Sequence, residues 1–182
     1  MKQFLYILGL TVLLSGIYTS CKTTSLDTMA ADELAALDKY VKAKKLTDFK
    51  DVSGIYFKDS IPSADTTMIR SGFKVMLYFK ITLLDGKTLP GFTTEDSAGR
   101  NYEEFAFYVD VNNTAVNAQY VQQIAGLHKG LKKMHVGETA FMVIPSEFAF
   151  KAVDNSAFGV PRFSTLLATV YAKRAYSPAQ QQ

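Results

Sequence analysis

The stretch that decides the fold reads IAGLHKGLKKMHVGETAFMVIPSEFAF over residues 124–150 and resumes as VPRFSTLL at 160–167. Apolar residues at helical spacing predict a helix that enters this stretch, and the glycines Gly126 and Gly130 predict its end. The apolar stripe of that helix consists of Val121, Ile124, Leu127 and Leu131. A strand follows at 138–145, where the residues alternate, so the stretch predicts a short helix packed across one face of a sheet.

Further alternating segments on both sides of this stretch supply the rest of the predicted sheet. They lie at 54–57, 75–84, 105–109 and 165–176. Asp85-Gly86 is a turn signal that closes the second of them. Residues 89–100 contain Pro90 and two glycines, which predicts a loop. Because strands with a single late helix do not form alternating βαβ units, the sequence predicts an α+β fold with a mainly antiparallel sheet.

A second, amphipathic helix is predicted near the N-terminus, at 30–46. Its expected apolar face is Leu34, Leu37, Val41 and the stem of Lys45, and Asp27 or Thr28 is the expected N-cap. Asp38 and Lys42 form a favourable i,i+4 pair. A helix lying on a membrane surface is the alternative, but three acidic residues argue against binding to anionic lipid: Asp32, Glu33 and Asp38.

The composition fits one folded domain with short extensions. The chain has 182 residues, of which 48% are hydrophobic and 13% aromatic, enough for a core. The net charge of +3 is small, and the lysines form two small clusters, at 42–45 and 129–133. A solvated surface explains these clusters better than a basic face does, so no nucleic-acid partner is predicted.

The N-terminus predicts export and lipidation. Residues 4–17 are almost wholly apolar or small, too short to span a bilayer but suited to a signal peptide covering 1–20. Thr19-Ser20-Cys21 resembles a lipobox, although Tyr18 stands where an aliphatic residue is usual. Lipid on Cys21, the only cysteine, would anchor the chain to a membrane through a tether at 21–29. An ordinary signal peptide with a chance cysteine is the alternative.

No constellation for covalent, metal or cofactor chemistry is present. The only histidines, His128 and His135, have no cysteine nearby and no carboxylate at ligand spacing, so we expect surface histidines and no metal site. The chain has no Gly-rich phosphate loop and no G-x-S-x-G elbow. We therefore expect no cofactor.

The segment 72–173 resembles FKBP-type peptidyl-prolyl cis-trans isomerases. The resemblance is carried by Asp85-Gly86, by the run from Gly126 through Met134 to Gly137-Glu138, and by Ile144-Pro145. It implies a twisted antiparallel β-sheet wrapped around one α-helix, over a domain at 51–176. An additional N-terminal helical segment at 30–50 precedes this domain, and 177–182 is a polar tail with no fold signal.

The resemblance also implies the positions of the active pocket. The implied catalytic positions are Phe79, Phe105, Ile124, Leu127 and Phe150, and the implied substrate-binding positions are Leu89, Pro90, Gln123, Val160 and Ala168. Several depart from the family pattern. Phe79 and Phe150 replace tyrosines, Leu127 replaces the tryptophan of the pocket floor, and Ala168 replaces a phenylalanine. Leu89-Pro90 stands for a Phe-Asp pair, and Gln123 for a valine. The predicted cleft stays apolar but loses its large floor ring and two polar groups.

Two functional hypotheses follow from the resemblance. In the first, the protein is a lipid-anchored prolyl isomerase that helps exported proteins to fold, with a proline-containing polypeptide as substrate. In the second, it is a catalytically weak or inactive FKBP-like binding module with an envelope protein as partner. The lipoprotein start and the N-terminal helix resemble FKBP-like lipoproteins of the gliding-motility type. This resemblance is compatible with both hypotheses. Either way we expect an exported lipoprotein anchored in the cell envelope, on the periplasmic side or in the outer membrane.

Overall fold

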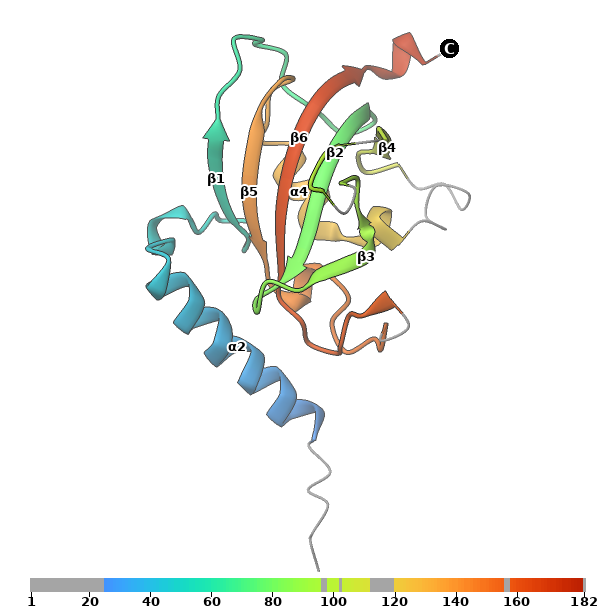
Figure 1. Ribbon diagram of the computed structural model, residues 1–182. Coiled ribbons are helices and arrows are strands. Elements are labelled where there is room, and N and C mark those ends of the chain that lie inside the picture. Colours follow the sequence, from blue (N-terminus) through green and yellow to red (C-terminus); the bar gives the residue numbers. More distant parts are fainter. Residues whose placement is uncertain (1–24, 96–97, 102, 112–119, 156–157, 182) are drawn as a thin grey trace, which may run out of the picture.

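The computed structural model describes residues 25–95, 98–101, 103–111, 120–155 and 158–181, and contains one twisted, six-stranded antiparallel sheet (Figure 1). The strands are β1 (Tyr56–Ile61), β2 (Lys74–Leu83), β3 (Thr88–Thr93), β4 (Phe105–Tyr108), β5 (Thr139–Ile144) and β6 (Leu166–Tyr176). Their order is β1-β5-β6-β2-β3, and β4 pairs with β2 beyond one end of β3's ladder. The helices are α2 (Leu26–Ala43) and α4 (Ala125–Leu131), with short 3₁₀ turns at Thr47–Phe49, Tyr120–Gln123, Ser146–Phe148 and Pro178–Gln180. The expected fold, a twisted antiparallel sheet around one helix with an additional N-terminal helix, is confirmed.

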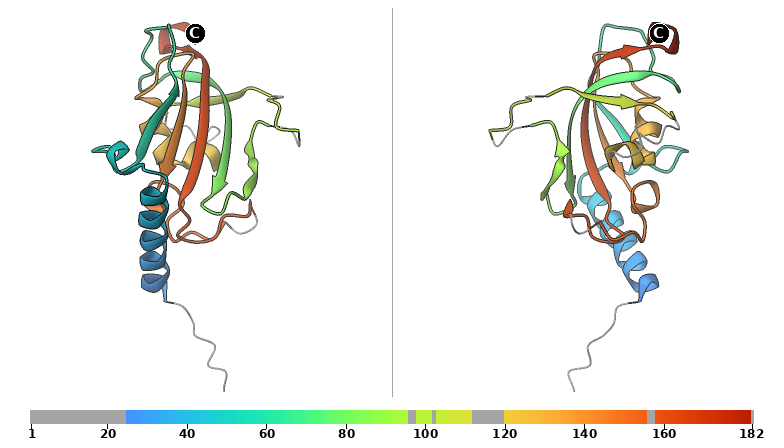
Figure 2. Two further views of the ribbon diagram at one scale, coloured as in Figure 1. Left: turned by 60° about the vertical axis from the view of Figure 1, so that its left-hand side comes forward. Right: turned by 90° about the vertical axis from the view of Figure 1, so that its right-hand side faces the viewer.

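The paired strands β2 and β6 show how the sheet divides into an inner and an outer face. β2 and β6 pair antiparallel from Lys74 opposite Tyr176 to Leu83 opposite Leu166, with one bulge. Burial alternates along β2, because side chains at successive positions point to opposite faces. The side chains on the inner face of the sheet pack with those of α4 and form the main core. Figure 2 shows α4 on the concave side of the curved sheet.

Gly126 and Gly130 both lie inside α4, so Gly126 does not end the helix as predicted, whereas Gly130 stands one residue before its end at Leu131. Both allow the helix to approach β5 closely. A Cβ on Gly126 would stand 2.3 Å from Cγ2 of Ile144, and one on Gly130 would stand 2.3 Å from Sδ of Met142. Distances this short require one of the groups to move. The two glycines are therefore contact positions between α4 and the sheet.

Helix α2 packs against the outer face of the sheet at one end, where Leu37 and Val41 meet Val143 of β5 and Leu167 of β6 (Figures 1 and 2). Two expectations for this helix were wrong. Leu34 is 60% exposed, while the neighbouring Glu33 is buried. The N-cap is Ser25, whose side chain accepts a hydrogen bond from the Thr28 amide, so the helix starts at Leu26, within the expected tether. The Asp38–Lys42 pair is formed, at 2.8 Å.

β3 occupies part of the segment expected to be a loop. It pairs only with β2, so the edge position tolerates Pro90, which has no amide hydrogen to donate. The first strand lies at Tyr56–Ile61, beyond the predicted 54–57, because Gly54 has a φ of +91° and belongs to the preceding turn.

The expected polar tail contains structure as well. Ser177 and Gln180 form a reciprocal capping box around Pro178–Gln180. The Gln181 amide then donates to the carbonyl oxygens of Gly72 and Tyr176, both at 3.0 Å. Cys21 and the predicted signal peptide lie outside the described residues. Within the described part of the chain, no helix is long and apolar enough to cross a bilayer.

Candidate functional site

The predicted site residues gather on the concave side of the sheet, around α4. Ile124 and Leu127 come from the start of α4, Phe79 from β2 and Phe150 from the segment that joins β5 to β6. All four belong to one apolar cluster. Most of the predicted positions are buried within it: Phe79, Leu89, Ile124, Leu127, Phe150, Val160 and Ala168. The topology therefore brings residues that are up to 89 positions apart in the chain (Phe79 to Ala168) into one apolar centre.

Two edge-to-face aromatic pairs organise this centre. The Phe79 and Phe105 rings lie 5.3 Å apart at 87°, and the Phe92 and Phe150 rings lie 5.9 Å apart at 82°. Edge-to-face packing is a preferred geometry for aromatic rings. Phe105 is only half-buried, so this pair extends from the core to the surface.

Phe92 is a buried residue of the cluster that the sequence does not predict, because it falls in a predicted loop. It lies in β3, is 1% exposed and belongs to the same cluster as Leu127 and Ala168. Those two positions are smaller than the rings that the family resemblance predicts there. Phe92 therefore adds a buried aromatic ring to the same cluster, packed edge-to-face on Phe150. The alternation of Leu89 and Phe92 is interrupted by Pro90-Gly91, which hides the strand in the sequence.

Four residues that the resemblance implies for the pocket, or that neighbour such positions, remain accessible. Pro90 and Gln123 are exposed, and Phe105 and Phe158 are half-buried. A Cβ on Gly159 would lie 3.7 Å from both Leu89 and Pro90, which places the β5–β6 segment beside the start of β3. The Phe158 ring lies 4.2 Å from the ring of Tyr120.

Polar backbone groups beside the centre are already paired. The Phe79 amide donates to Oγ1 of the buried Thr94 at 2.8 Å, and the Thr94 amide donates to the Phe79 carbonyl oxygen at 2.8 Å. Phe79 and Phe150 themselves offer no hydroxyl. The side chains at the centre of the cluster are therefore apolar.

His128 is not a surface histidine, in contrast to the prediction. Its ring lies 4.7 Å from that of Phe107, its Nδ1 accepts from the Asp110 amide at 3.0 Å, and its Nε2 donates to the Gln122 carbonyl oxygen at 2.7 Å. Burial lowers the pKa of His128 below its usual value, despite that bond and the nearby Asp110 carboxylate. The neutral ring thus holds the turn before Ile124 in place.

Gln122 completes this support. Its side-chain oxygen accepts from the Tyr108 amide at 3.3 Å, and its amide donates to the Ala106 carbonyl oxygen at 3.2 Å. The side chain is buried, so both polar ends need these partners. Together with His128 it fixes residues 120–124, which lead into α4, against β4.

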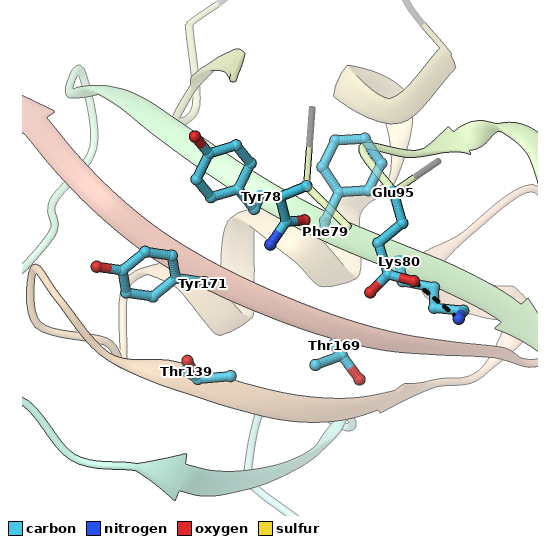
Figure 3. Close-up of a pocket in the computed structure, with 8 residues that line it drawn as sticks. Tyr78, Phe79, Lys80, Glu95, Thr139, Thr169 and Tyr171 are labelled. Atoms are coloured by element: carbon cyan, nitrogen blue, oxygen red, sulfur yellow. Dashed lines mark hydrogen bonds and ion pairs between the residues drawn. The ribbon is translucent and has the colours of Figure 1, made fainter. Parts of the chain in front are cut away.

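A separate hollow of about 340 Å³ lies on the outer face of the sheet (Figure 3). Tyr78 and Tyr171 are direct partners across β2 and β6, and their rings are nearly parallel, 6.2 Å apart. The Lys80–Glu95 ion pair, at 2.8 Å, borders the same hollow. Figure 3 shows these side chains on the near side of the strands, away from Phe79. Apart from Phe79, no predicted site residue lines this hollow.

In the described part of the chain, no group of three or more histidine, cysteine, aspartate or glutamate side chains could hold a metal ion. Lys129 and Lys133 of the region around α4 are engaged elsewhere. Lys129 donates to the Ser53 carbonyl oxygen at 2.7 Å, and Lys133 pairs with Asp51 at 2.5 Å. The centre of the concave side is therefore apolar in the part of the chain that the structure describes.

Comparison with known proteins agrees with this geometry. A family model described as FKBP-type peptidyl-prolyl cis-trans isomerase matches residues 65–171, more than half of the chain. No curated protein sequence matches significantly.

Among solved structures, the chain is similar to FkpA from Escherichia coli, with a TM-score of 0.61 and 23% identity over 97% of this chain and 72% of that one. It is also similar to a peptidyl-prolyl cis-trans isomerase from Pseudomonas syringae, with a TM-score of 0.59 and 17% identity over 81% of this chain and 96% of that one. A third similar structure, the three FKBP domains of wheat FKBP73, gives a TM-score of 0.56 and 22% identity over 70% of this chain and 48% of that one. These likenesses show the fold.

Proposed function

The chain belongs to the FKBP-type peptidyl-prolyl cis-trans isomerase family, and from this premise we propose that its concave apolar cluster is where an X-Pro amide is bound and rotated. The observation that carries this proposal is the convergence of Phe79, Phe105, Leu127 and Phe150 on one centre that reaches the surface at Phe105. The residues come from β2, β4, α4 and the β5–β6 segment.

Such a site needs no acid, base or nucleophile. The barrier to rotation, about 18–20 kcal/mol, comes from amide resonance, which places charge on the carbonyl oxygen and nitrogen. In the twisted transition state this charge separation is reduced. An apolar, water-poor wall therefore disfavours the planar amide more than the twisted one, and the difference accelerates rotation. The aromatic rings are suited to holding the proline ring while the rest of the peptide turns.

The missing hydroxyls lower the expected rate. Neither Phe79 nor Phe150 can donate a hydrogen bond to the peptide. One such bond contributes about 0.5–1.5 kcal/mol, which is about two- to tenfold in rate. Leu89, Leu127 and Ala168 are buried, so we expect the substrate to bind near the surface, against the half-buried Phe105. We therefore expect a measurable but modest activity.

We further propose that the protein works outside the cytoplasm as a lipoprotein that assists the folding of exported chains. The support is the apolar run at 4–17 and the lipobox-like Thr19-Ser20-Cys21. Uncatalysed prolyl isomerisation takes tens of seconds, which gives an isomerase a use where exported chains fold.

A binding module without turnover is the second candidate. The observation that favours it is the tight packing of the predicted pocket positions, with Leu127 1% and Phe150 7% exposed. A coupled isomerisation assay on a Leu-Pro or Phe-Pro peptide separates the two functions. A rate above the buffer blank supports the isomerase, and a rate equal to the blank in folded protein, together with saturable binding of the peptide, supports the binding module.

A further inference from the structure

Glu33, on the N-terminal helix α2, is buried where that helix meets the domain. Its Oε1 accepts hydrogen bonds from the Ser146 amide and from Oγ1 of Thr165, both at 2.7 Å. Its Oε2 accepts from Oγ of Ser146 at 2.6 Å. All three donors are neutral, and Ser146 and Thr165 are as buried as the carboxylate.

The two partners of Glu33 stand at opposite ends of one segment. β5 ends at Ile144 and β6 begins at Leu166, so Ser146 opens the connection between them and Thr165 closes it. This β5–β6 segment carries two of the predicted site residues, Phe150 and Val160. One carboxylate from α2, more than 110 positions earlier in the chain, thus ties together both ends of the segment.

Inside the segment, two backbone hydrogen bonds connect Ser146 and Phe163 to the residue that follows Phe150. The Ser146 carbonyl oxygen accepts from the Lys151 amide at 2.9 Å, and the Lys151 carbonyl oxygen accepts from the Phe163 amide at 2.8 Å. Phe150 directly precedes Lys151, which takes part in both bonds, and its ring packs edge-to-face on Phe92. A shift at the two ends therefore moves the backbone that carries Phe150.

We propose that Glu33 is a positioning residue for the isomerase reaction: it fixes the β5–β6 segment, and so makes α2 part of the machinery that places Phe150. Glu33 does not touch the substrate, and its effect on turnover rests on the proposed function of the concave cluster. Hydrogen bonds to a buried carboxylate are among the stronger ones, and loss of the acceptor leaves buried donors unpaired.

The first test is local and needs no activity. Glu33→Ala removes all three bonds, whereas Glu33→Gln keeps an oxygen toward the Ser146 amide and Thr165 and can donate to Oγ of Ser146. Asp32→Ala, on the exposed neighbour, is the matched control. Amide hydrogen exchange at the described residues of 146–165 should accelerate about tenfold or more in Glu33→Ala and stay near wild type in Glu33→Gln and Asp32→Ala. Exchange in β2 should not change.

The second test is kinetic. If the unmodified protein is active, kcat/KM should fall about tenfold in Glu33→Ala and return to within about twofold in Glu33→Gln. Thr165→Val removes a single bond and should give a smaller change of the same kind, which keeps the test available if Glu33→Ala fails to fold. Unchanged exchange in the segment, or an unchanged kcat/KM in an active protein, would overturn the assignment to Glu33. An inactive unmodified protein would instead count against the proposed function.

Discussion

Gly126 of α4 lies directly against Ile144 of β5, so that a Cβ on the glycine would stand 2.3 Å from Cγ2 of the isoleucine. This contact sets the distance between the single central helix and the sheet that it supports. The neighbouring Leu127 and Ile124 are buried at the centre of the candidate site, so the same contact also determines how close these two side chains lie to the sheet.

Gly126→Ala should destabilise the fold by about 1–3 kcal/mol, since the added methyl group has to displace either α4 or Ile144. Ile144→Ala alone should cost about 2–5 kcal/mol through the cavity it leaves. In the double variant the alanine at 126 has room, so the two losses should not add. Urea unfolding of the three variants measures this coupling, and strictly additive losses would show that the close approach does not constrain the helix.

Phe150→Tyr should raise kcat/KM by about two- to tenfold, because it returns a hydroxyl that can donate to the substrate carbonyl. Phe148→Tyr is the matched control. It adds the same hydroxyl in the same segment, but its ring lies under the ammonium group of Lys129, 3.4 Å from the ring centroid. A coupled assay on one X-Pro peptide compares them, and an equal rise in both variants would speak against a specific role for position 150.

Asp51 should make stability depend on pH. A hydrogen bond from Lys133, together with bonds from Ser53, holds the pKa of Asp51 far below its usual value. A folded-state pKa below the unfolded one stabilises the fold above about pH 4 and loses that contribution as the pH falls further. Asp51→Asn should therefore lower the urea midpoint at pH 7, and the difference should shrink between pH 4 and pH 2.

Asp38→Asn is the control for this prediction. The Asp38–Lys42 pair has a similar N–O distance, 2.8 Å, but both side chains are more than 60% exposed. Exposed pairs of this kind contribute little to stability. A midpoint loss in Asp38→Asn as large as in Asp51→Asn would contradict the special role of the Asp51–Lys133 contact.

Cys21→Ala should abolish incorporation of labelled fatty acid and leave a soluble or unprocessed precursor in place of a membrane-bound form. The reason is that the thiol is the attachment point of the proposed lipid, and at least two acyl chains are needed for stable anchoring. Ser20→Ala keeps a small residue before the cysteine and should be labelled normally. Fatty-acid labelling that persists in Cys21→Ala would refute the lipoprotein proposal.

Regular alternation made much of the sheet predictable. Burial alternates along β2, while β5 and β6 alternate only in part, and the predicted bounds of all three differ from the observed ones by at most one residue. β3 could not be predicted in the same way, since Pro90 and Gly91 interrupt its pattern and are tolerated only because the strand is at an edge. Its Phe92 was consequently placed in a predicted loop.

The role of α2 shows why the site could be predicted only in part. Spacing alone favoured Leu34 as an inward residue, yet Glu33 faces the domain. A buried carboxylate is favourable only where donors are already placed to meet it, and these donors, Ser146 and Thr165, lie more than 110 residues away in the chain. The glycines of α4 are a similar case, because a sequence shows that a Cβ is absent but not which neighbour requires its absence.

The isomerisation rate of a Leu-Pro peptide, measured for the unmodified protein and for two single-site variants, tests the central claim most directly. The unmodified protein should exceed the buffer blank. Phe105→Ala removes a half-buried ring of the concave cluster and should lower kcat/KM, whereas Tyr171→Ala on the outer face should not. A rate equal to the blank in folded protein, or an equal loss in both variants, would contradict an isomerase site on the concave side of the sheet.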